Sequence, residues 1–198
     1  MIHAVVFDLG DVLASPPSLL PELAKRIGTT RERLETHYWE GRVDYDAGVP
    51  DEQYWGPLLE AVGVESDPGL IADLAELDAS CWSELRATAR QLLREVRGAG
   101  VTVAVLSNSP RTMQVAADKA PWRSDVDHLF VSATIGLSKP DTALYRHVER
   151  KLGHEGREIA FVDDKQANVD AAVEAGWQGH VWTSDADTRI WLVGLGVL

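Results

Sequence analysis

The sequence predicts an α/β fold: a doubly wound, Rossmann-like parallel sheet of five strands with a helical cap subdomain. Three observations predict it. Short apolar runs of strand length recur along the chain, each bounded by glycine or polar residues. Amphipathic helical patterns separate most of these runs, as crossovers between parallel strands require. A long stretch after the first run has helical spacing only, which indicates an insertion.

The first strand is predicted at residues 2–7, a mostly apolar run that stops at Asp8, with Gly10 placed to turn the chain. Four more strands are predicted at residues 101–106, 126–131, 159–162 and 179–182. Such runs are typical of parallel strands because helices cover both faces of the sheet.

Helices are predicted between these strands at residues 85–99, 111–119, 141–152 and 166–175. In the first of them, apolar residues recur on one face, and Gly98 and Gly100 supply its stop. In a sheet wound in this way, ligands bind outside the carboxyl ends of the strands. The functional residues are therefore expected where the strands end.

The insertion at residues 15–83 contains predicted helices at residues 19–27, 31–40, 51–62 and 68–79, with glycines between them. No strand-like run interrupts it. We therefore predict an α/β core made of residues 1–14 and 84–198, and a helical cap of residues 15–83 inserted after the first strand.

The charge balance restricts the class of ligand. With 31 acidic and 19 basic side chains the chain has a net charge of −12, which argues against nucleic-acid binding because phosphate backbones need a basic surface. No stretch approaches the ~20 apolar residues of a membrane span. The single cysteine, Cys81, suits a reducing compartment, so we expect a cytoplasmic protein. The oligomeric state stays open.

Polar side chains follow four of the predicted strands. In chain order they are Asp8, then Ser107 with Asn108, then Lys139, then Asp163 with Asp164. Together they offer a carboxylate nucleophile, a hydroxyl donor, a cation and an acidic pair that can hold a hard metal ion. Each has an ordinary structural explanation, such as capping the next helix. The whole set at one edge of a sheet points to chemistry.

The order of these motifs resembles that of the haloacid dehalogenase-like (HAD) hydrolase superfamily. The four matching segments are residues 7–12 (FDLGDV), 106–108 (LSN), 138–140 (SKP) and 161–164 (FVDD). Residues 105–176, including Asn168, are similar to small bacterial phosphatases of this superfamily that carry a helical cap after the first motif. The resemblance covers essentially the whole chain.

This resemblance implies a phosphatase that hydrolyses a small phosphorylated metabolite, a sugar phosphate being one candidate. Asp8 would attack phosphorus and form an aspartyl-phosphate. Ser107 and Asn108 would bind the phosphoryl oxygens, and Lys139 would offset the negative charge that gathers around them.

The resemblance also implies Mg²⁺, held by Asp8, the main-chain carbonyl of Gly10 and Asp164, with Asp163 acting through a water molecule. The sequence departs from the family at Gly10, where most such phosphatases have a second aspartate that protonates the leaving group. Asp11 stands one residue further on and is not assigned this role. A missing acid–base group costs about 10²–10⁴ in rate unless another group replaces it.

The cap is expected to close over the site and select the substrate. Arg42 is the candidate substrate contact in the cap, with Tyr45 as a second choice, while packing inside the protein is favoured for most of its aromatic residues.

Two alternatives to hydrolysis of a phosphate ester stay open. Gly10 allows a non-catalytic or weakly active protein that binds a phospho-ligand. A 2-haloacid dehalogenase would use the same nucleophile without a metal, and the pair Asp163 and Asp164 argues against it.

Overall fold

A computed structural model, which describes residues 1–198, confirms the predicted fold class. Five parallel strands form one sheet in the order β3-β2-β1-β4-β5. The strands are β1 (Ala4–Phe7), β2 (Thr102–Ser107), β3 (His128–Val131), β4 (Ile159–Asp163) and β5 (Gln178–Val181). Because β1 lies in the centre, the residue that follows it is surrounded by the ends of β2 and β4.

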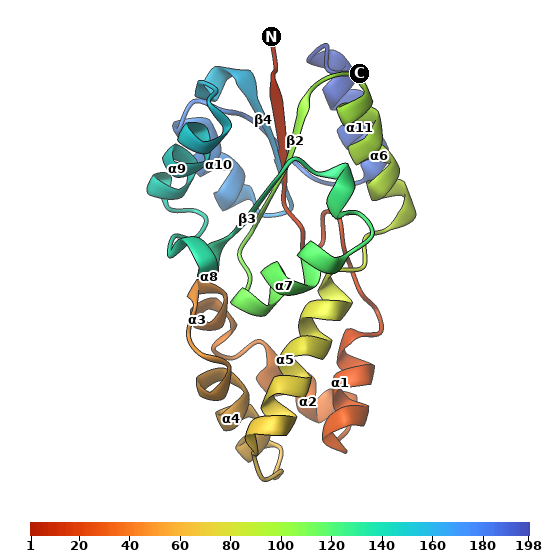
Figure 1. Cartoon of the computed structure of the whole chain (residues 1–198), viewed down its shortest axis with the longest axis vertical. Coiled ribbons are helices and arrows are strands. Elements are labelled where there is room, and N and C mark those ends of the chain that lie inside the picture. Colours follow the sequence, from red (N-terminus) through yellow and green to blue (C-terminus); the bar gives the residue numbers. More distant parts are fainter.

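Helices cover both faces of the sheet (Figure 1). In chain order they are α6 (Ala87–Gly98), α7 (Arg111–Lys119), α8 (Ser132–Ile135), α9 (Thr142–Leu152), α10 (Gln166–Glu174) and α11 (Asp185–Gly194). Short 3₁₀ turns lie at Arg123–Asp125 and Gly156–Glu158. Helices α6 and α11 pack together on one face, and α9 and α10 on the other. Helices α8 and α11 were not among the predicted elements.

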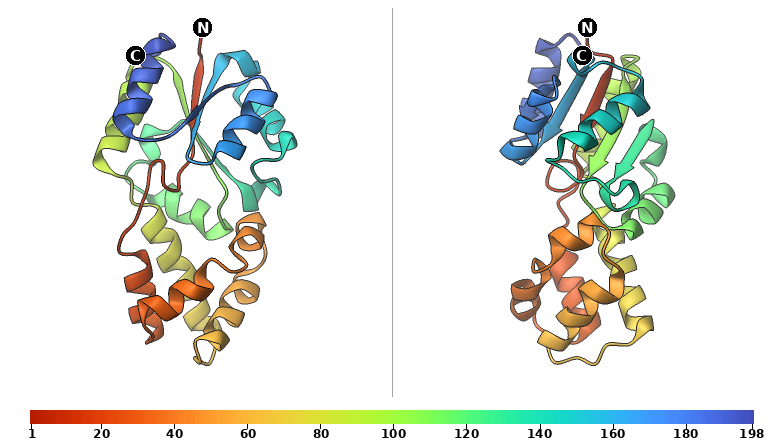
Figure 2. Two further views of the ribbon diagram at one scale, coloured as in Figure 1. Left: turned by 180° about the vertical axis from the view of Figure 1, so that it is seen from behind. Right: turned by 90° about the vertical axis from the view of Figure 1, so that its left-hand side faces the viewer.

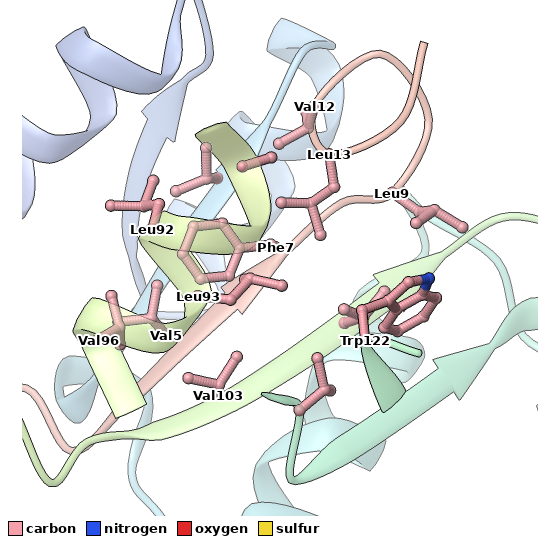
Figure 3. Close-up of a cluster of buried hydrophobic side chains, with 14 of the residues drawn as sticks. Val5, Phe7, Leu9, Val12, Leu13, Leu92, Leu93, Val96, Val103 and Trp122 are labelled. Carbon is pink, nitrogen blue, oxygen red and sulfur yellow. The ribbon is translucent and has the colours of Figure 1, made fainter. Parts of the chain in front are cut away.

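Strand β1 is buried on both faces, which fixes the position of its carboxyl end. Val5 and Phe7 point to α6 and pack against Leu92 and Leu93 (Figure 3). The alternate residues Ala4 and Val6 belong to a second cluster, which includes the side chains of α9 and α10. All four residues of the strand are buried.

The five helices between β1 and α6 form a separate layer beyond the carboxyl ends of the strands (Figures 1 and 2). We call this layer the cap. Its helices are α1 (Leu19–Ile27), α2 (Arg31–Tyr38), α3 (Arg42–Ala47), α4 (Asp51–Ala61) and α5 (Pro68–Trp82). The cap has its own hydrophobic cluster, which includes Leu34, Trp55 and Leu59.

Helix α3 differs from the sequence prediction, which placed no helix between residues 41 and 48. Gly41 and Gly48 both adopt left-handed conformations, with φ of 68° and 113°, and they flank the six residues of α3. The predicted helix at residues 31–40 ends earlier, at Tyr38. No helix of the chain is long and apolar enough to cross a membrane.

Candidate active site

Asp8 directly follows β1 and is buried, with 7% of its surface exposed. Its Oδ1 accepts a hydrogen bond from the Leu9 amide at 2.7 Å and pairs with Lys139 Nζ at 2.8 Å. No side chain or amide donates to its Oδ2. Burial raises the pKa of the Asp8 carboxyl to about 7, against the opposing charge of Lys139. The result is a fixed carboxylate with one oxygen free, next to a cation.

Lys139 is also buried, and its ammonium is shared by two carboxylates, Asp8 at 2.8 Å and Asp163 at 2.6 Å. Burial alone would lower the pKa of Lys139, but the charges of Asp8 and Asp163 raise it. The Asn108 side chain donates to the Lys139 carbonyl and accepts from its amide, both at 2.9 Å. Asn108 therefore holds the loop that carries the cation.

Asp163 and Asp164 differ in their surroundings. Asp163 is fully buried, and its oxygens accept from Lys139 Nζ, the Lys165 amide and Asn168 Nδ2. The Asp164 side chain is half-buried and accepts from no other side chain; burial and the charge of Asp163 raise its pKa. Asp163 thus orients the lysine, while Asp164 has free oxygens.

The carboxylates suit a divalent cation. Oxygens of Asp8, Asp163 and Asp164 lie within 4.8 Å of one another. The Gly10 carbonyl beside them accepts none of the backbone hydrogen bonds of its loop. Hard, oxygen-only donors of this kind are the ligands that Mg²⁺ prefers, and a cation beside Asp8 would favour the ionised form of that carboxyl. The donor set therefore fits the predicted metal.

A cavity of about 490 Å³ lies between the core and the cap and opens onto these residues. Asp8, Ser107, Lys139 and Asp164 line its floor. Ser107 is the last residue of β2, is 4% exposed, and its hydroxyl has no hydrogen-bond partner. Around this one cavity the structure gathers all the predicted core residues except Asp163, which lies buried behind Lys139, and a free hydroxyl and a free carboxylate oxygen line the cavity.

Arg42 lines the same cavity, but its guanidinium turns into the cap. It pairs with Asp46 at 2.8 Å and Asp78 at 3.1 Å, also donates to the Tyr38 hydroxyl, and is only 11% exposed. These contacts give Arg42 a structural role, and its contact with substrate stays a prediction. Tyr45 is buried inside the cap, where its hydroxyl donates to Asp51.

Several residues of the cavity were not predicted to be functional. The roof includes Trp39, Val43, Asp46, Asp78 and Trp82. Asp78 carried a usable signal, because a carboxylate interrupts the apolar face that Leu74 and Ala75 begin in α5. For Trp39 and Val43 the informative property is their exposure, 54% and 82%, which only the structure shows.

Comparison with known proteins shows the family to which the chain belongs. The family model of haloacid dehalogenase-like hydrolases matches residues 2–176. A sesquiterpene phosphatase of Aspergillus oryzae is 32% identical over 89% of this chain and 87% of its own. A phosphatase of Mycobacterium tuberculosis is 29% identical over 95% of this chain and 90% of its own. An (S)-2-haloacid dehalogenase of Burkholderia cepacia also matches, at 26% identity over 89% of this chain and 80% of its own.

Among solved structures, a HAD family enzyme of Bacteroides thetaiotaomicron, in complex with magnesium and inorganic phosphate, superposes with a TM-score of 0.72. It is 19% identical, and the match covers 92% of this chain and 95% of that chain. At this identity the likeness concerns the fold.

Proposed function

Since the chain belongs to the haloacid dehalogenase-like hydrolase family, we propose that it is a phosphatase that hydrolyses a small phosphomonoester through an aspartyl-phosphate on Asp8. The observation that carries this proposal is the Asp8 carboxylate, buried at the end of β1 with one oxygen held and the other free. The relative at 32% identity is a sesquiterpene phosphatase, which supports the same reaction class.

The first step uses residues that already face the cavity. Asp8 Oδ2 attacks phosphorus while the bond from phosphorus to the ester oxygen breaks, and the alcohol leaves with a proton taken from water. Ser107 Oγ, which has no partner within the protein, donates to a phosphoryl oxygen. Lys139 balances the charge at Asp8. Fixed donors and charges of this kind stabilise a phosphoryl group in transfer.

In the second step water attacks phosphorus and the bond between phosphorus and Asp8 breaks. Inorganic phosphate, which carries the oxygen and protons of that water, is released, and the Asp8 carboxylate is regenerated. Asn108 and Asp163 act through Lys139: Asn108 holds its backbone and Asp163 its ammonium. We therefore propose Asn108 as a positioning residue rather than a direct ligand of phosphate.

We propose that Asp8, Asp164 and the Gly10 carbonyl hold Mg²⁺, with Asp163 reaching it through water. When bound, the ion neutralises negative charge on the phosphoryl oxygens. Support comes from the cluster of carboxylate oxygens within 4.8 Å and from the unpartnered Gly10 carbonyl. The cap boundaries at residues 15 and 83 and the cytoplasmic location remain expectations from the sequence.

The two alternatives predict different behaviour. A haloacid dehalogenase would release halide from a 2-haloacid in the presence of a chelator, and Asp164, free of side-chain partners, has no task in such a reaction. A phospho-ligand-binding protein would bind phosphate esters without turnover. Gly10, where no acid stands, is the observation that favours this second alternative.

The deciding experiment measures phosphate release from an aryl phosphate and from a panel of sugar and nucleotide phosphates, with Mg²⁺ and with a chelator. Asp8→Asn should lower kcat by at least about 10³-fold, because an amide oxygen is a poor nucleophile. Asp44→Asn is the matched control, an exposed aspartate in α3 whose side chain makes no hydrogen bond. Unchanged turnover in Asp8→Asn would refute the assigned nucleophile.

A further inference from the structure

The cavity above Asp8 has two chemically different ends. Its floor carries the carboxylates, Ser107 and Lys139, whereas much of its roof and rim is apolar. The apolar lining includes Met113 from α7 and five residues from the cap: Trp39, Val43, Ala47, Ala79 and Trp82. A phosphoryl group seated on the floor therefore directs the rest of its ester toward this lining.

Trp82 turns its apolar edge to the reacting groups. Its indole N–H donates to the Tyr38 hydroxyl at 3.1 Å, inside the cap. The opposite edge of the ring, at Cζ3, lies 3.6 Å from the place where a β-carbon on Gly10 would stand. The side chain just above the nucleophile loop thus offers carbon and no hydrogen-bonding group.

The charged groups of the roof are bound to one another. Arg42 pairs with Asp46 and Asp78, and Asp78 also accepts from Tyr38. One cation between two carboxylates leaves no free positive charge in the roof. Lys165 also borders the cavity, but it is an exposed residue of the core wall that forms no ion pair, so its charge lies outside the roof.

Two exposed apolar side chains continue this lining outward. Trp39 and Val43 are 54% and 82% exposed, and both border the cavity. An apolar group that covers these side chains removes apolar surface from water, which favours its binding. The hydroxyls of a sugar would lose water against these two side chains, which offer only the indole N–H of Trp39 in return.

From these observations, and resting on the proposed phosphatase function, we infer that the alcohol part of the substrate is an uncharged, apolar group. It lies between Trp39 and Val43 at the mouth and Trp82 and Met113 further in. The structure thus favours an apolar alkyl or aryl phosphate over a sugar phosphate.

The test compares esters that share one leaving-group chemistry. Hexyl phosphate and glucose 6-phosphate have equal numbers of carbon atoms and are both primary alkyl phosphates, so the missing acid at Gly10 affects them alike. We expect kcat/KM to be higher for hexyl phosphate and to rise along the series from ethyl to octyl phosphate, by up to about fourfold per methylene. Equal values along the series, or a preference for glucose 6-phosphate, would overturn the inference.

Variants locate the effect. Trp39→Ala should flatten the dependence of kcat/KM on chain length, and Val43→Ala should reduce it in part. Val173→Ala is the control, because Val173 is an exposed helical valine on α10, far from the cavity lining. An unchanged slope in both Trp39→Ala and Val43→Ala would place the apolar group elsewhere and refute the assigned lining.

A binding measurement separates this inference from the reaction itself. Calorimetric titration of Asp8→Asn with hexyl phosphate and with glucose 6-phosphate, in Mg²⁺, needs no turnover. Tighter binding of hexyl phosphate supports the apolar lining even if the wild type hydrolyses neither ester, in which case only the proposed function fails. Equal or weaker binding of hexyl phosphate contradicts the inference while leaving the phosphatase activity in place.

Discussion

Gly10 leaves room for a side chain beside the nucleophile and supplies no acid group there. Its φ lies outside the left-handed region, and a β-carbon there would meet only the Trp82 ring, at an ordinary contact distance of 3.6 Å. A β-carbon therefore fits at position 10 without moving the backbone. In the wild type no carboxyl group stands at this point of the nucleophile loop to protonate a departing alcohol.

The variant Gly10→Asp should raise kcat/KM for alkyl phosphates by about tenfold or more, because alkoxide leaving groups need a proton. Aryl phosphates should gain less, since phenolate leaves more easily without one. Steady-state rates with hexyl phosphate and phenyl phosphate measure the difference. Gly10→Asn is the isosteric control. An equal gain with asparagine would mean that the proton is not the cause.

The residues of the floor could be predicted because they depend on topology alone. Any parallel sheet with β1 in the centre brings Asp8 and Ser107 to the same edge, together with Asp164. The tasks of Asn108 and Arg42 could not be predicted in the same way. Asn108 binds the backbone of Lys139, and Arg42 faces two aspartates, through contacts that arise only when distant segments fold together.

Two helices of the cap contact the core: α5 packs against α7, and α3 is tied to the core by hydrogen bonds. Ser132 at the start of α8 donates to the Asp46 carbonyl, and Arg111 donates to the Gly48 carbonyl at 2.9 Å. These contacts hold the C-terminal end of α3, and with it the Asp46 side chain, over the cavity. The pairing of Arg42 with Asp46 then joins one turn of α3 to the next.

Asp46 makes the stability of this element depend on pH. Burial raises the pKa of its carboxyl from 3.8 to about 6, more than Arg42 lowers it. The folded state therefore binds this proton more tightly than the unfolded state, and the stability that it contributes is lost as pH rises from about 4 through about 6. In Asp46→Asn the decrease in the free energy of unfolding over this pH range should be smaller than in the wild type by about 1–3 kcal/mol.

Urea unfolding of both proteins at several pH values checks this expectation. The free energy of unfolding of Asp46→Asn should increase relative to the wild type as pH rises through that range. In Asp44→Asn, whose exposed side chain has no partner in the same helix, the difference from the wild type should stay constant. A constant difference for Asp46→Asn as well would show that its carboxyl is not the titrating group.

Prediction of elements from the sequence succeeded where apolar periodicity was long and failed where it was short. Helix α7 and helix α1 have the predicted limits, because several apolar residues repeat on one face. Helix α3 has only six residues, and its flanking glycines looked like breaks. At the start of helix α11 the Ser184 side chain accepts from the Asp187 amide, so the sequence contains a capping signal. Ile190 is exposed, however, and the apolar residues of this helix therefore do not mark a single buried face.

Taken as a whole, the molecule has separate hydrophobic clusters in the cap and on the two faces of the sheet. Two connections join cap and core, at residues 14–18 and 83–86. Arg86 ties them together: its amide donates to the Leu13 carbonyl at 3.0 Å, and its guanidinium donates to the Val12 carbonyl and to Asp185. Although α5 packs on α7 and α3 on α8, the separate hydrophobic clusters and the two chain connections favour separate opening of the cap.

Amide hydrogen exchange in two leucine variants tests this arrangement. Leu59 in the cap and Leu93 in α6 are both fully buried, and truncation to alanine costs about 2–5 kcal/mol at such sites. If the cap opens while the core stays folded, Leu93→Ala destabilises the closed state and the cap-open state by the same amount. The free energy of cap opening is then unchanged. The slowest amides of the cap should then exchange at the wild-type rate, whereas amides of β1 and β4 should exchange about 30-fold faster or more.

Leu59→Ala should instead accelerate both sets, because complete unfolding also includes loss of the cap. Uniform acceleration in both variants would mean that cap and core open as one cooperative unit. Independent opening of the cap matters for activity, because the cavity above Asp8 lies between the cap and the core. A cap that opens on its own lets an ester reach the nucleophile while the strands that hold Asp8 and Lys139 stay fixed.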